Sequence, residues 1–380
     1  FVMRPIRFLD IPLLSLVTGT LVSVAFVWAS NVSAEPILKA LPAEPAASSH
    51  LETTPQGERG KAGAQRGLSQ KIAAMVEAMA RGTYGGRFIH MRGDQLDLMR
   101  VIHRHVDGQR VELMVSENGE VREIRRLGDR CACVWPERGQ VMLGDYPNIN
   151  SRLSGERFES VGELSANYRL IDLGGSRVAG QACHLMAVVP RDDLRYGYKL
   201  CIGESTPLLL RMSIYDESGR AIEHNQFTQI EPIESVRLNF QDDLTAGLKN
   251  KFERVELGGE PVEEAPIRQQ QWVVDPLPAG FDVRSRGWRR NPVTGQYFEH
   301  IVVTDGLATA SVFVEKRDGD AAHRVTRTDQ GMTMAVRSVD SVRITAIGDV
   351  PAETVERLVE NTVRDAGAVP AAEEPAVESR

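Results

Sequence analysis

Two histidines in one strand pattern are the best candidates for metal chemistry. His103 and His105 flank Arg104. On a β-strand, alternate side chains point to one face, so both imidazoles could contact one zinc ion. Protein zinc sites usually have three or four protein ligands, and no nearby carboxylate or cysteine motif completes this pair. We therefore expect two polar side chains on a solvated sheet face, with no metal site and no cofactor.

Other catalytic motifs are incomplete. None of the 8 histidines is followed by glutamate, which excludes the His-Glu-x-x-His zinc-protease motif. The stretch Gly174-Gly-Ser-Arg-Val lacks the last glycine of a nucleophile elbow. The stretch Gly57-Glu-Arg-Gly-Lys is too short for a phosphate-binding loop. We expect no catalytic residues, and an enzyme ranks behind a binding protein.

Two of the four cysteines are placed to form a disulfide. Cys183 and Cys201 are equally distant from Asp192, near the midpoint of a predicted hairpin, and such residues face each other across the strands. We predict a cross-strand bridge between them. Cys131 and Cys133 would share one face of a strand. Metal binding would need more ligands, so two buried or paired cysteines are the simpler interpretation.

Arginine gathers in two clusters. The first holds Arg122, Arg125, Arg126 and Arg130, and the second holds Arg284, Arg286, Arg289 and Arg290. Guanidinium groups bind carboxylates and phosphates in a bidentate manner. A solvated face is the alternative for either cluster. The net charge of −7 weighs against a nucleic-acid binder. The two arginine clusters themselves favour an acidic peptide or an anionic lipid headgroup as the ligand. We predict that the second cluster contacts a partner.

The elements that would position these residues begin with one helix. Ile72, Met75, Val76 and Met79 recur at helical spacing, and Gly82 ends the pattern. Methionine adapts to flexible apolar ligands, so Met75 and Met79 are candidate ligand-binding residues that would line an apolar cleft of the first domain. The alternative is that these methionines belong to the apolar core.

After Gly82 the apolar period changes to two, which predicts strands. Asp107-Gly and Asn118-Gly between alternating runs are strong hairpin signals. Strands are predicted at Tyr84–Met91, Leu98–Val106, Val111–Ser116, Val121–Leu127, Cys131–Trp135, Tyr168–Leu173, Arg177–Val189, Tyr196–Ile202, Leu208–Tyr215 and Ala221–Ile230. Short strands in hairpin order predict an antiparallel sheet whose edges must close or be covered.

The N-terminus has the order of a secretory signal. Arg4 and Arg7 precede an apolar run from Ile11 to Ala29, and the small residues of Val32-Ser-Ala follow. We predict a signal peptide over 1–34 and export across a membrane, to a compartment where disulfides can form. An uncleaved membrane anchor is the alternative, which Asp10 and Gly19 disfavour.

The length of 380 residues exceeds one typical domain and predicts about two. The hydrophobic content of 42% is ordinary for a globular protein. The stretch 35–67 is rich in Ala, Pro, Ser and Gly and predicts a disordered leader. An N-terminal domain over 68–240 and an acidic linker over 241–270 follow. A second domain over 271–365 has several strands and a final helix from Pro351 to Asp365. The tail 366–380 is predicted to be disordered.

Several ordered motifs resemble the MucB/RseB family. In the first domain they are Tyr84-Gly-Gly-Arg-Phe-Ile, His103-Arg-His-Val-Asp-Gly, Ser176-Arg-Val-Ala-Gly, Val189-Pro-Arg-Asp, Arg195-Tyr-Gly-Tyr and Phe227-Thr-Gln-Ile. In the second they are Gly280-Phe, Thr304-Asp-Gly-Leu-Ala, Ser311-Val-Phe-Val and Ile347-Gly-Asp-Val-Pro. The motifs occur in the family's order over Leu68 to Asp365, and this order carries the resemblance. The cysteine pair Cys131 and Cys133 and the long leader depart from the family pattern.

The resemblance implies an α+β fold that is mostly antiparallel β. Its first domain would be a LolA/LolB-like half-open β-barrel with covering helices, and its second a smaller C-terminal α+β domain. It implies a periplasmic negative regulator of sigma-E-type signalling. Such a protein binds the periplasmic domain of an RseA/MucA-like anti-sigma factor, protects it from regulated proteolysis, and senses lipopolysaccharide or lipoprotein acyl chains. The alternative is a periplasmic lipid or lipoprotein carrier of the LolA/LolB type, which would not need the second domain.

Overall fold

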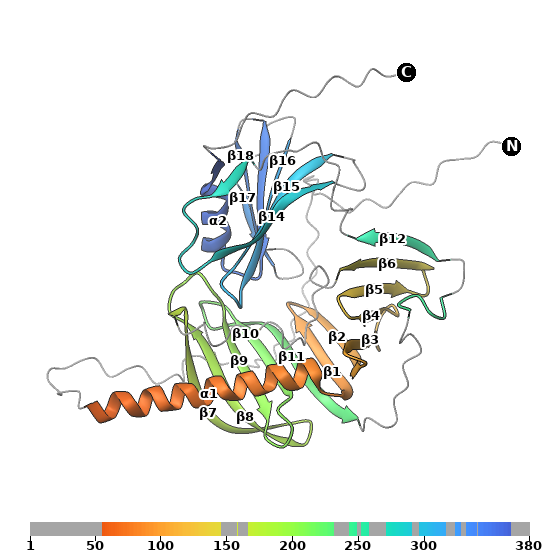
Figure 1. Cartoon of the computed structure of the whole chain (residues 1–380), viewed down its shortest axis with the longest axis vertical. Coiled ribbons are helices and arrows are strands. Elements are labelled where there is room, and N and C mark those ends of the chain that lie inside the picture. Colours follow the sequence, from red (N-terminus) through yellow and green to blue (C-terminus); the bar gives the residue numbers. More distant parts are fainter. Residues whose placement is uncertain are drawn as a thin grey trace, which may run out of the picture. The chain divides into compact units, whose positions relative to one another are not determined.

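The computed structural model describes ten parts of the chain, and all structural statements concern these parts. They are residues 55–145, 158, 166–231, 243–248, 252–257, 271–290, 296–316, 324–327, 332–339 and 341–365. The described strands form a 12-stranded sheet, a two-stranded sheet and a six-stranded sheet (Figure 1). The predicted signal peptide, most of the leader and the tail lie outside the described residues.

The first sheet is open and antiparallel except at one edge. Its strands are β1 (Tyr84–Arg92), β2 (Gln95–Val106), β3 (Gln109–Ser116), β4 (Glu123–Leu127), β5 (Arg130–Trp135), β6 (Gln140–Asp145), β7 (Tyr168–Val178), β8 (Gln181–Pro190), β9 (Gly197–Gly203), β10 (Leu209–Tyr215), β11 (Ala221–Glu231) and β12 (Glu253–Leu257). Their order is β12-β6-β5-β4-β3-β2-β1-β11-β10-β9-β8-β7, so β12 and β7 are the edges. The sheet is a half-open barrel, as expected.

Local sequence explains the hairpins. Asp107 and Gly108 have φ values of 51° and 79°, and Ala179 and Gly180 have 49° and 78°. Positive φ at two central residues matches the twist of the flanking strands, and glycine adopts it without steric cost. The long-range pairing of β1 with β11 then joins the two halves of the sheet.

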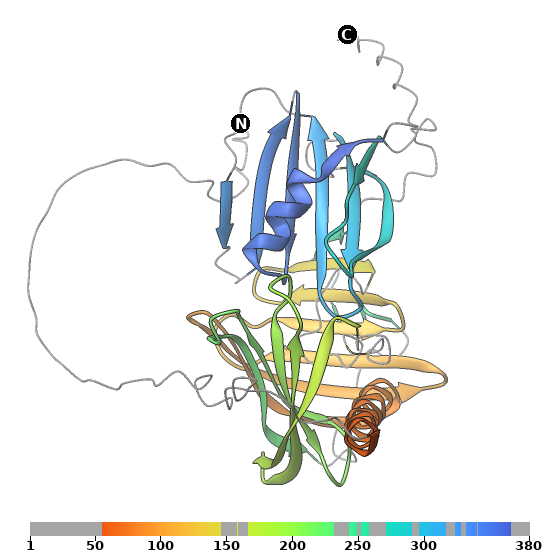
Figure 2. The same ribbon diagram turned by 90° about the vertical axis from the view of Figure 1, so that its left-hand side faces the viewer.

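Helix α1 (Pro55–Arg81) packs against this sheet through its apolar stripe. It contacts β7, β2 and β9, and Figure 2 views the helix nearly end-on beside the strands. The helix begins at Pro55, inside the stretch interpreted as a disordered leader. Met75 and Met79 are 0% and 3% exposed in the main core, so these side chains line no cleft in this structure.

Cys183 and Cys201 form a disulfide with Cα atoms 5.5 Å apart. The hairpin symmetry predicted that these two residues would lie directly opposite each other, but they do not. Cys183 pairs with Gly203, and Cys201 pairs with Leu185. The bridge is therefore diagonal, because the hairpin is centred one residue later than the sequence suggested.

The six-stranded sheet, called the second sheet from here on, follows β13 (Trp272–Val274) in the chain. It is antiparallel throughout. Its strands are β14 (Asp282–Arg290), β15 (Tyr297–Thr304), β16 (Thr309–Lys316), β17 (Arg324–Arg327), β18 (Thr333–Val339) and β19 (Val342–Gly348), in the order β14-β15-β16-β19-β18-β17. Helix α2 (Ala352–Glu360) packs on β18 and β19. The predicted final helix ends early, because residues after Asn361 form β20 (Thr362–Arg364), which pairs with β13.

The acidic stretch 241–270 contains regular structure among its described residues. Glu253–Leu257 forms β12, which pairs in parallel with β6. Leu244 is buried in a small core with Val141 and Leu143. Part of the expected linker is thus integral to the first sheet. None of the helices in the described part of the chain has the length and apolarity required to cross a membrane.

Candidate functional site

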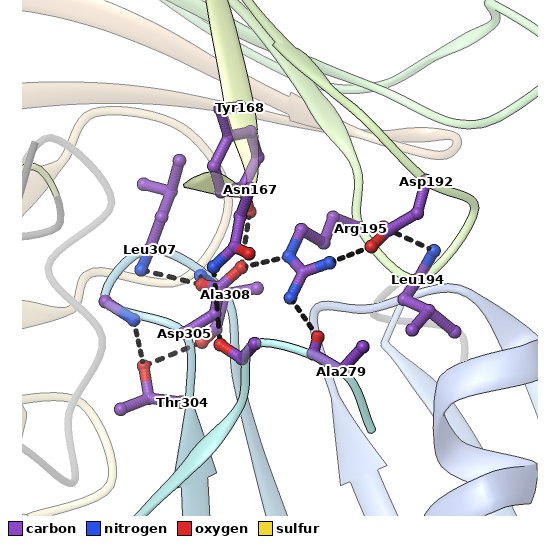
Figure 3. Close-up of polar contacts among 12 residues, drawn as sticks. Asn167, Tyr168, Asp192, Leu194, Arg195, Ala279, Thr304, Asp305, Leu307 and Ala308 are labelled. Atoms are coloured by element: carbon purple, nitrogen blue, oxygen red, sulfur yellow. Dashed lines mark hydrogen bonds and ion pairs between the residues drawn. The ribbon is translucent and has the colours of Figure 1, made fainter. Parts of the chain in front are cut away.

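A buried arginine connects the first and second sheets. Arg195, just before β9, is 1% exposed. Its guanidinium forms ion pairs with Asp192 and Asp305 and donates to the carbonyl of Ala279 (Figure 3). It also lies 4.9 Å from the centroid of the Phe281 ring. Burial would lower the pKa of Arg195, but hydrogen bonds and charge from Asp192 and Asp305 outweigh it and raise the pKa.

Asp305, in the turn between β15 and β16, organises the other side of this contact. One carboxylate oxygen accepts backbone N–H groups of Leu307 and Ala308 at 2.9 and 2.7 Å. The other oxygen accepts the Tyr168 hydroxyl at 2.9 Å. Burial, Tyr198 and Asp305 together raise the pKa of Tyr168 well above its ordinary value, so this hydroxyl is a permanent donor. The described partners of the Asp305 carboxylate are thus all hydrogen-bond donors: the Tyr168 hydroxyl, the Arg195 guanidinium and two backbone N–H groups.

Apolar side chains cross the same contact in both directions. Leu194, beside Arg195, is buried in the core of the second sheet, and Leu307, beside Asp305, is buried in the core of the first. The Thr354 hydroxyl of α2 donates to the carbonyl of Leu194 at 2.7 Å. We call Tyr168, Asp192, Leu194, Arg195, Gly280, Asp305 and Leu307 the joint.

Gly280 is required by the crowding at the joint. Its φ is +73°, and an added Cβ would lie 2.4 Å from Oδ1 of Asn167 and 2.7 Å from Nη2 of Arg195. The Asn167 amide donates to the Gly280 carbonyl at 3.3 Å. Only glycine combines this conformation with this close approach.

A second polar contact lies at the end of β1. Arg92 forms an ion pair with Asp349, which follows β19, and another with Glu223 of β11 at 3.1 Å. Glu223 in turn accepts the Asn225 amide at 2.8 Å, and the Asn225 oxygen lies 2.7 Å from Nδ1 of His90. These buried side chains extend a polar network from the contact into the first sheet.

The joint gathers motifs that are far apart in sequence. Val189-Pro-Arg-Asp and Arg195-Tyr-Gly-Tyr lie at the turn between β8 and β9, whereas Gly280-Phe and Thr304-Asp-Gly-Leu-Ala lie in the second part of the chain. Sequence reasoning marked these stretches only as family motifs and assigned no role to Arg195 or Asp305. The available signal was one charged residue inside each of two otherwise uncharged motifs, Arg195 in Arg195-Tyr-Gly-Tyr and Asp305 in Thr304-Asp-Gly-Leu-Ala.

The second arginine cluster is divided by the pleat of β14. Arg286 points inward, where it pairs with the fully buried Glu299 at 3.0 Å and with Asp365 at 3.6 Å. Arg289 pairs in register with Phe298 on the other face, and Arg284 is exposed. The side chain of Arg290 lies outside the description. The structure does not bring Arg286 into one patch with Arg284 and Arg289.

The first arginine cluster is also divided. Arg125 is buried and donates to the carbonyls of Leu244 and Ala246 at 3.1 and 2.8 Å, which fixes the 243–248 turn on the sheet. Arg126 and Arg130 line an open cavity of about 900 Å³ with Asp129 and Asp243. This lining mixes both charges, so the cavity is not an apolar site for an acyl chain.

His103 is not on a solvated face, contrary to expectation. It is 1% exposed, stacks on Tyr84 at 4.6 Å and lies 2.9 Å from Glu112. Burial favours a raised pKa for Glu112, but the hydrogen bond and electrostatic interaction with His103, together with the charges of Arg126 and Arg110, lower this pKa. His105 is exposed, and no metal-binding group of three ligands occurs among the described residues.

Cys131 and Cys133 are buried thiols on β5 outside any disulfide. The Cys131 thiol donates to the carbonyl of Gly144 at 3.3 Å. Burial raises the pKa of Cys133 against the opposing charge of Arg122. A protonated, buried thiol is a poor nucleophile or metal ligand.

Comparison with protein families matches both parts of the chain. The MucB/RseB N-terminal domain matches residues 68–244, and the MucB/RseB C-terminal domain matches residues 266–363. The chain belongs to the MucB/RseB family. The family consists of regulatory binding proteins, and its two domain matches meet at the joint described above.

Two curated relatives of this MucB/RseB chain are sigma factor regulators. The sigma factor AlgU regulatory protein MucB of Pseudomonas aeruginosa is 28% identical over 296 residues, covering 76% of this chain and 89% of that protein. The sigma-E factor regulatory protein RseB of Escherichia coli K12 is 25% identical over 279 residues, covering 72% of this chain and 83% of that protein.

Solved structures agree with this membership. The complex of Pseudomonas aeruginosa MucA and MucB matches with a TM-score of 0.61 and 25% identity, covering 79% of this chain and 100% of that chain. MucB in complex with the periplasmic part of MucA matches with a TM-score of 0.59 and 24% identity, covering 79% and 100%. The likeness extends over both domains of the MucB/RseB fold.

Proposed function

We propose that this chain is a periplasmic negative regulator of sigma-E-type signalling. It binds the periplasmic domain of an RseA/MucA-like anti-sigma factor and protects that domain from regulated proteolysis. The observation that carries the proposal is the match of both family domains in order, over 68–244 and 266–363. MucB, a relative of similar architecture, occurs in a complex with MucA. We propose a binding protein rather than an enzyme.

The proposal is tested by binding and protection together. The mature chain, without residues 1–34, is mixed with the recombinant periplasmic domain of the MucA-like anti-sigma factor from the same organism. We expect a stable complex in size-exclusion chromatography and slower cleavage of the anti-sigma domain by the periplasmic protease that starts the cascade. An uncomplexed anti-sigma domain, cleaved at the same rate with and without the chain, would overturn the proposal.

We further propose that lipopolysaccharide or lipoprotein acyl chains release the partner. An open sheet closed by one amphipathic helix supports this, since α1 is the only described helix of the first domain. Because Met75 and Met79 are fully packed in the core, an acyl chain would have to displace α1 to contact them. Flexible methionine side chains can repack around such a ligand.

Lipid sensing is tested with lipopolysaccharide and with an acylated fluorescent probe. We expect both to bind the mature chain and to displace the anti-sigma domain. Replacing Met75 and Met79 with leucine conserves volume and should change probe affinity more than stability. A chain that binds neither probe would remove the sensing half of the proposal and leave partner binding in place.

A LolA/LolB-type carrier is the second candidate function, because a half-open barrel alone would serve it. The second domain distinguishes the two functions, since a carrier does not need the buried joint. Transfer of lipoprotein between membranes by the mature chain, without retention of an anti-sigma domain, would favour the carrier. We propose a periplasmic location, which fractionation of cells producing the full chain tests.

A further inference from the structure

β14 (Asp282–Arg290) is an edge strand of the second sheet among the described residues. It pairs with β15 on one side, and the other end of the same sheet is β17. Edge strands present a row of backbone N–H and C=O groups that another chain can join. The first half of β14 is open to solvent, since Asp282, Arg284 and Ser285 are exposed and Val283 is 46% exposed.

The side chains of β14 divide between structure and surface. Arg286 points inward and is fixed by the fully buried Glu299. A β-bulge between Val283 and Ser285 leaves Arg284 on the exposed part of the strand. Arg284 therefore has no role in the core, and its charge is available at the edge.

The C-terminal half of β14 lies beside a half-buried group of aromatic rings on β15 and β16. Arg289 is in register with Phe298, and the ring of His300 stacks on Phe313 at 4.6 Å with an interplanar angle of 6°. Burial and the positive charge of Arg289 lower the pKa of His300 to about 4, so the imidazole is neutral at neutral pH. With Arg286 paired inward to Glu299, the described cations left at the surface of this strand are Arg284 and Arg289, beside one exposed carboxylate, Asp282.

We infer that the β14 edge is the docking surface for an acidic, extended segment of the anti-sigma partner, which adds to the second sheet as a further strand. This inference rests on the proposed function and names the site at which it acts. Main-chain hydrogen bonds to the edge would supply affinity, and side chains would supply specificity. Charge complementarity selects an acidic segment, because Arg284 and Arg289 repel a basic one.

A purely protective role for these arginines is the competing explanation. Charged side chains, bulges and inward-pointing charges all discourage edge-to-edge aggregation, and β14 has all three. Reversing the charge at Arg284 separates the two roles. A glutamate still protects the edge, but it repels an acidic strand.

The decisive comparison uses two arginines on opposite edges of one sheet. Arg284 lies on β14 and Arg324 lies on β17, and both are exposed. We expect Arg284→Glu to weaken binding of the recombinant anti-sigma periplasmic domain by about three- to tenfold at low salt, from the strength of one exposed ion pair and its reversal. Arg324→Glu should leave the affinity within about twofold, from the same estimate for a site outside the interface. Equal effects of the two substitutions would overturn the inference.

Hydrogen exchange tests strand addition itself. Amides of β14 that point away from β15 are expected to exchange quickly in the free chain, and an added strand would protect them at alternate positions. We expect slower exchange over residues 282–290 in the complex and no change over β17. A complex that forms with unchanged exchange at β14 would refute this docking surface while leaving the proposed function intact. If no complex forms with the unmodified chain, the proposed function fails first.

Discussion

Arg195 at the joint and Arg284 at the β14 edge show how differently one residue type can act. Arg195 is buried, has two carboxylate partners and donates to a backbone carbonyl. Arg284 is exposed on an edge strand. Breaking a buried ion pair leaves an uncompensated charge in the interior, whereas an exposed arginine keeps its hydration. The joint should therefore govern stability, and the edge should govern recognition.

The strongest test of this contrast removes the charge at the joint. We expect Arg195→Met to lower the free energy of unfolding by about 3–5 kcal/mol, because Asp305 keeps a buried charge without its guanidinium. Urea unfolding followed by tryptophan fluorescence and circular dichroism measures the loss. The double variant with Arg195→Met and Asp305→Asn should recover part of the lost free energy of unfolding. A loss no larger than that of Arg284→Met would break the contrast.

Arg286 sharpens the contrast within a single strand. Arg286→Ala should cost about 2–3 kcal/mol, because the buried Glu299 loses its cation and, among the described residues, is left with the N–H groups of Gln271 and Trp272. Arg284→Ala on the same strand should change stability by about 0.5 kcal/mol or less. Thermal and urea unfolding of both variants checks this. A test of partner binding should therefore leave Arg286 unchanged. Replacing all four arginines of the second cluster would also remove this buried ion pair and destabilise the fold.

Crowding at the joint predicts a smaller, backbone-level effect. Gly280 and Gly247 have similar φ values of +73° and +77°, but only Gly280 has atoms within 4 Å of an added Cβ. Alanine at Gly247 should cost about 1 kcal/mol from the left-handed conformation. Gly280→Ala should cost about 1–2 kcal/mol more, since Asn167 or Arg195 must move. Equal losses in urea unfolding would mean that the joint is loosely packed.

The smallest expected effect concerns the charge beside the β14 edge. His300 has a pKa of about 4, lowered by burial and by Arg289. The unfolded state therefore binds more protons between pH 6.5 and 4, and this contribution to stability is lost as the pH falls through that range. Arg289→Gln should raise the His300 pKa slightly, because burial remains. NMR titration of the imidazole measures it, and an unchanged pKa would show that Arg289 is not close enough to act.

Sequence patterns were sufficient for local structure because local forces set it. Alternating apolar residues and the Asp107-Gly turn determined β2 and β3 nearly to their ends, since side-chain period and positive φ depend only on neighbours. The motif order was sufficient for the family. Short strands such as β6 and β12 carried too little alternation to be recognised, and α1 extended past its apolar stripe.

The tertiary structure alone decided which polar residues matter. Alternation assigns a residue to a face of a strand, but it fixes neither the register nor the partner strand. Thus Cys183 is opposite Gly203 rather than Cys201, and Met75 is a core residue rather than part of a cleft. Arg195 and Asp305 are 110 positions apart and become partners only when both sheets have formed. The contribution of a charged side chain to stability depends on its burial and on its partner, and neither can be deduced from its neighbours in the sequence.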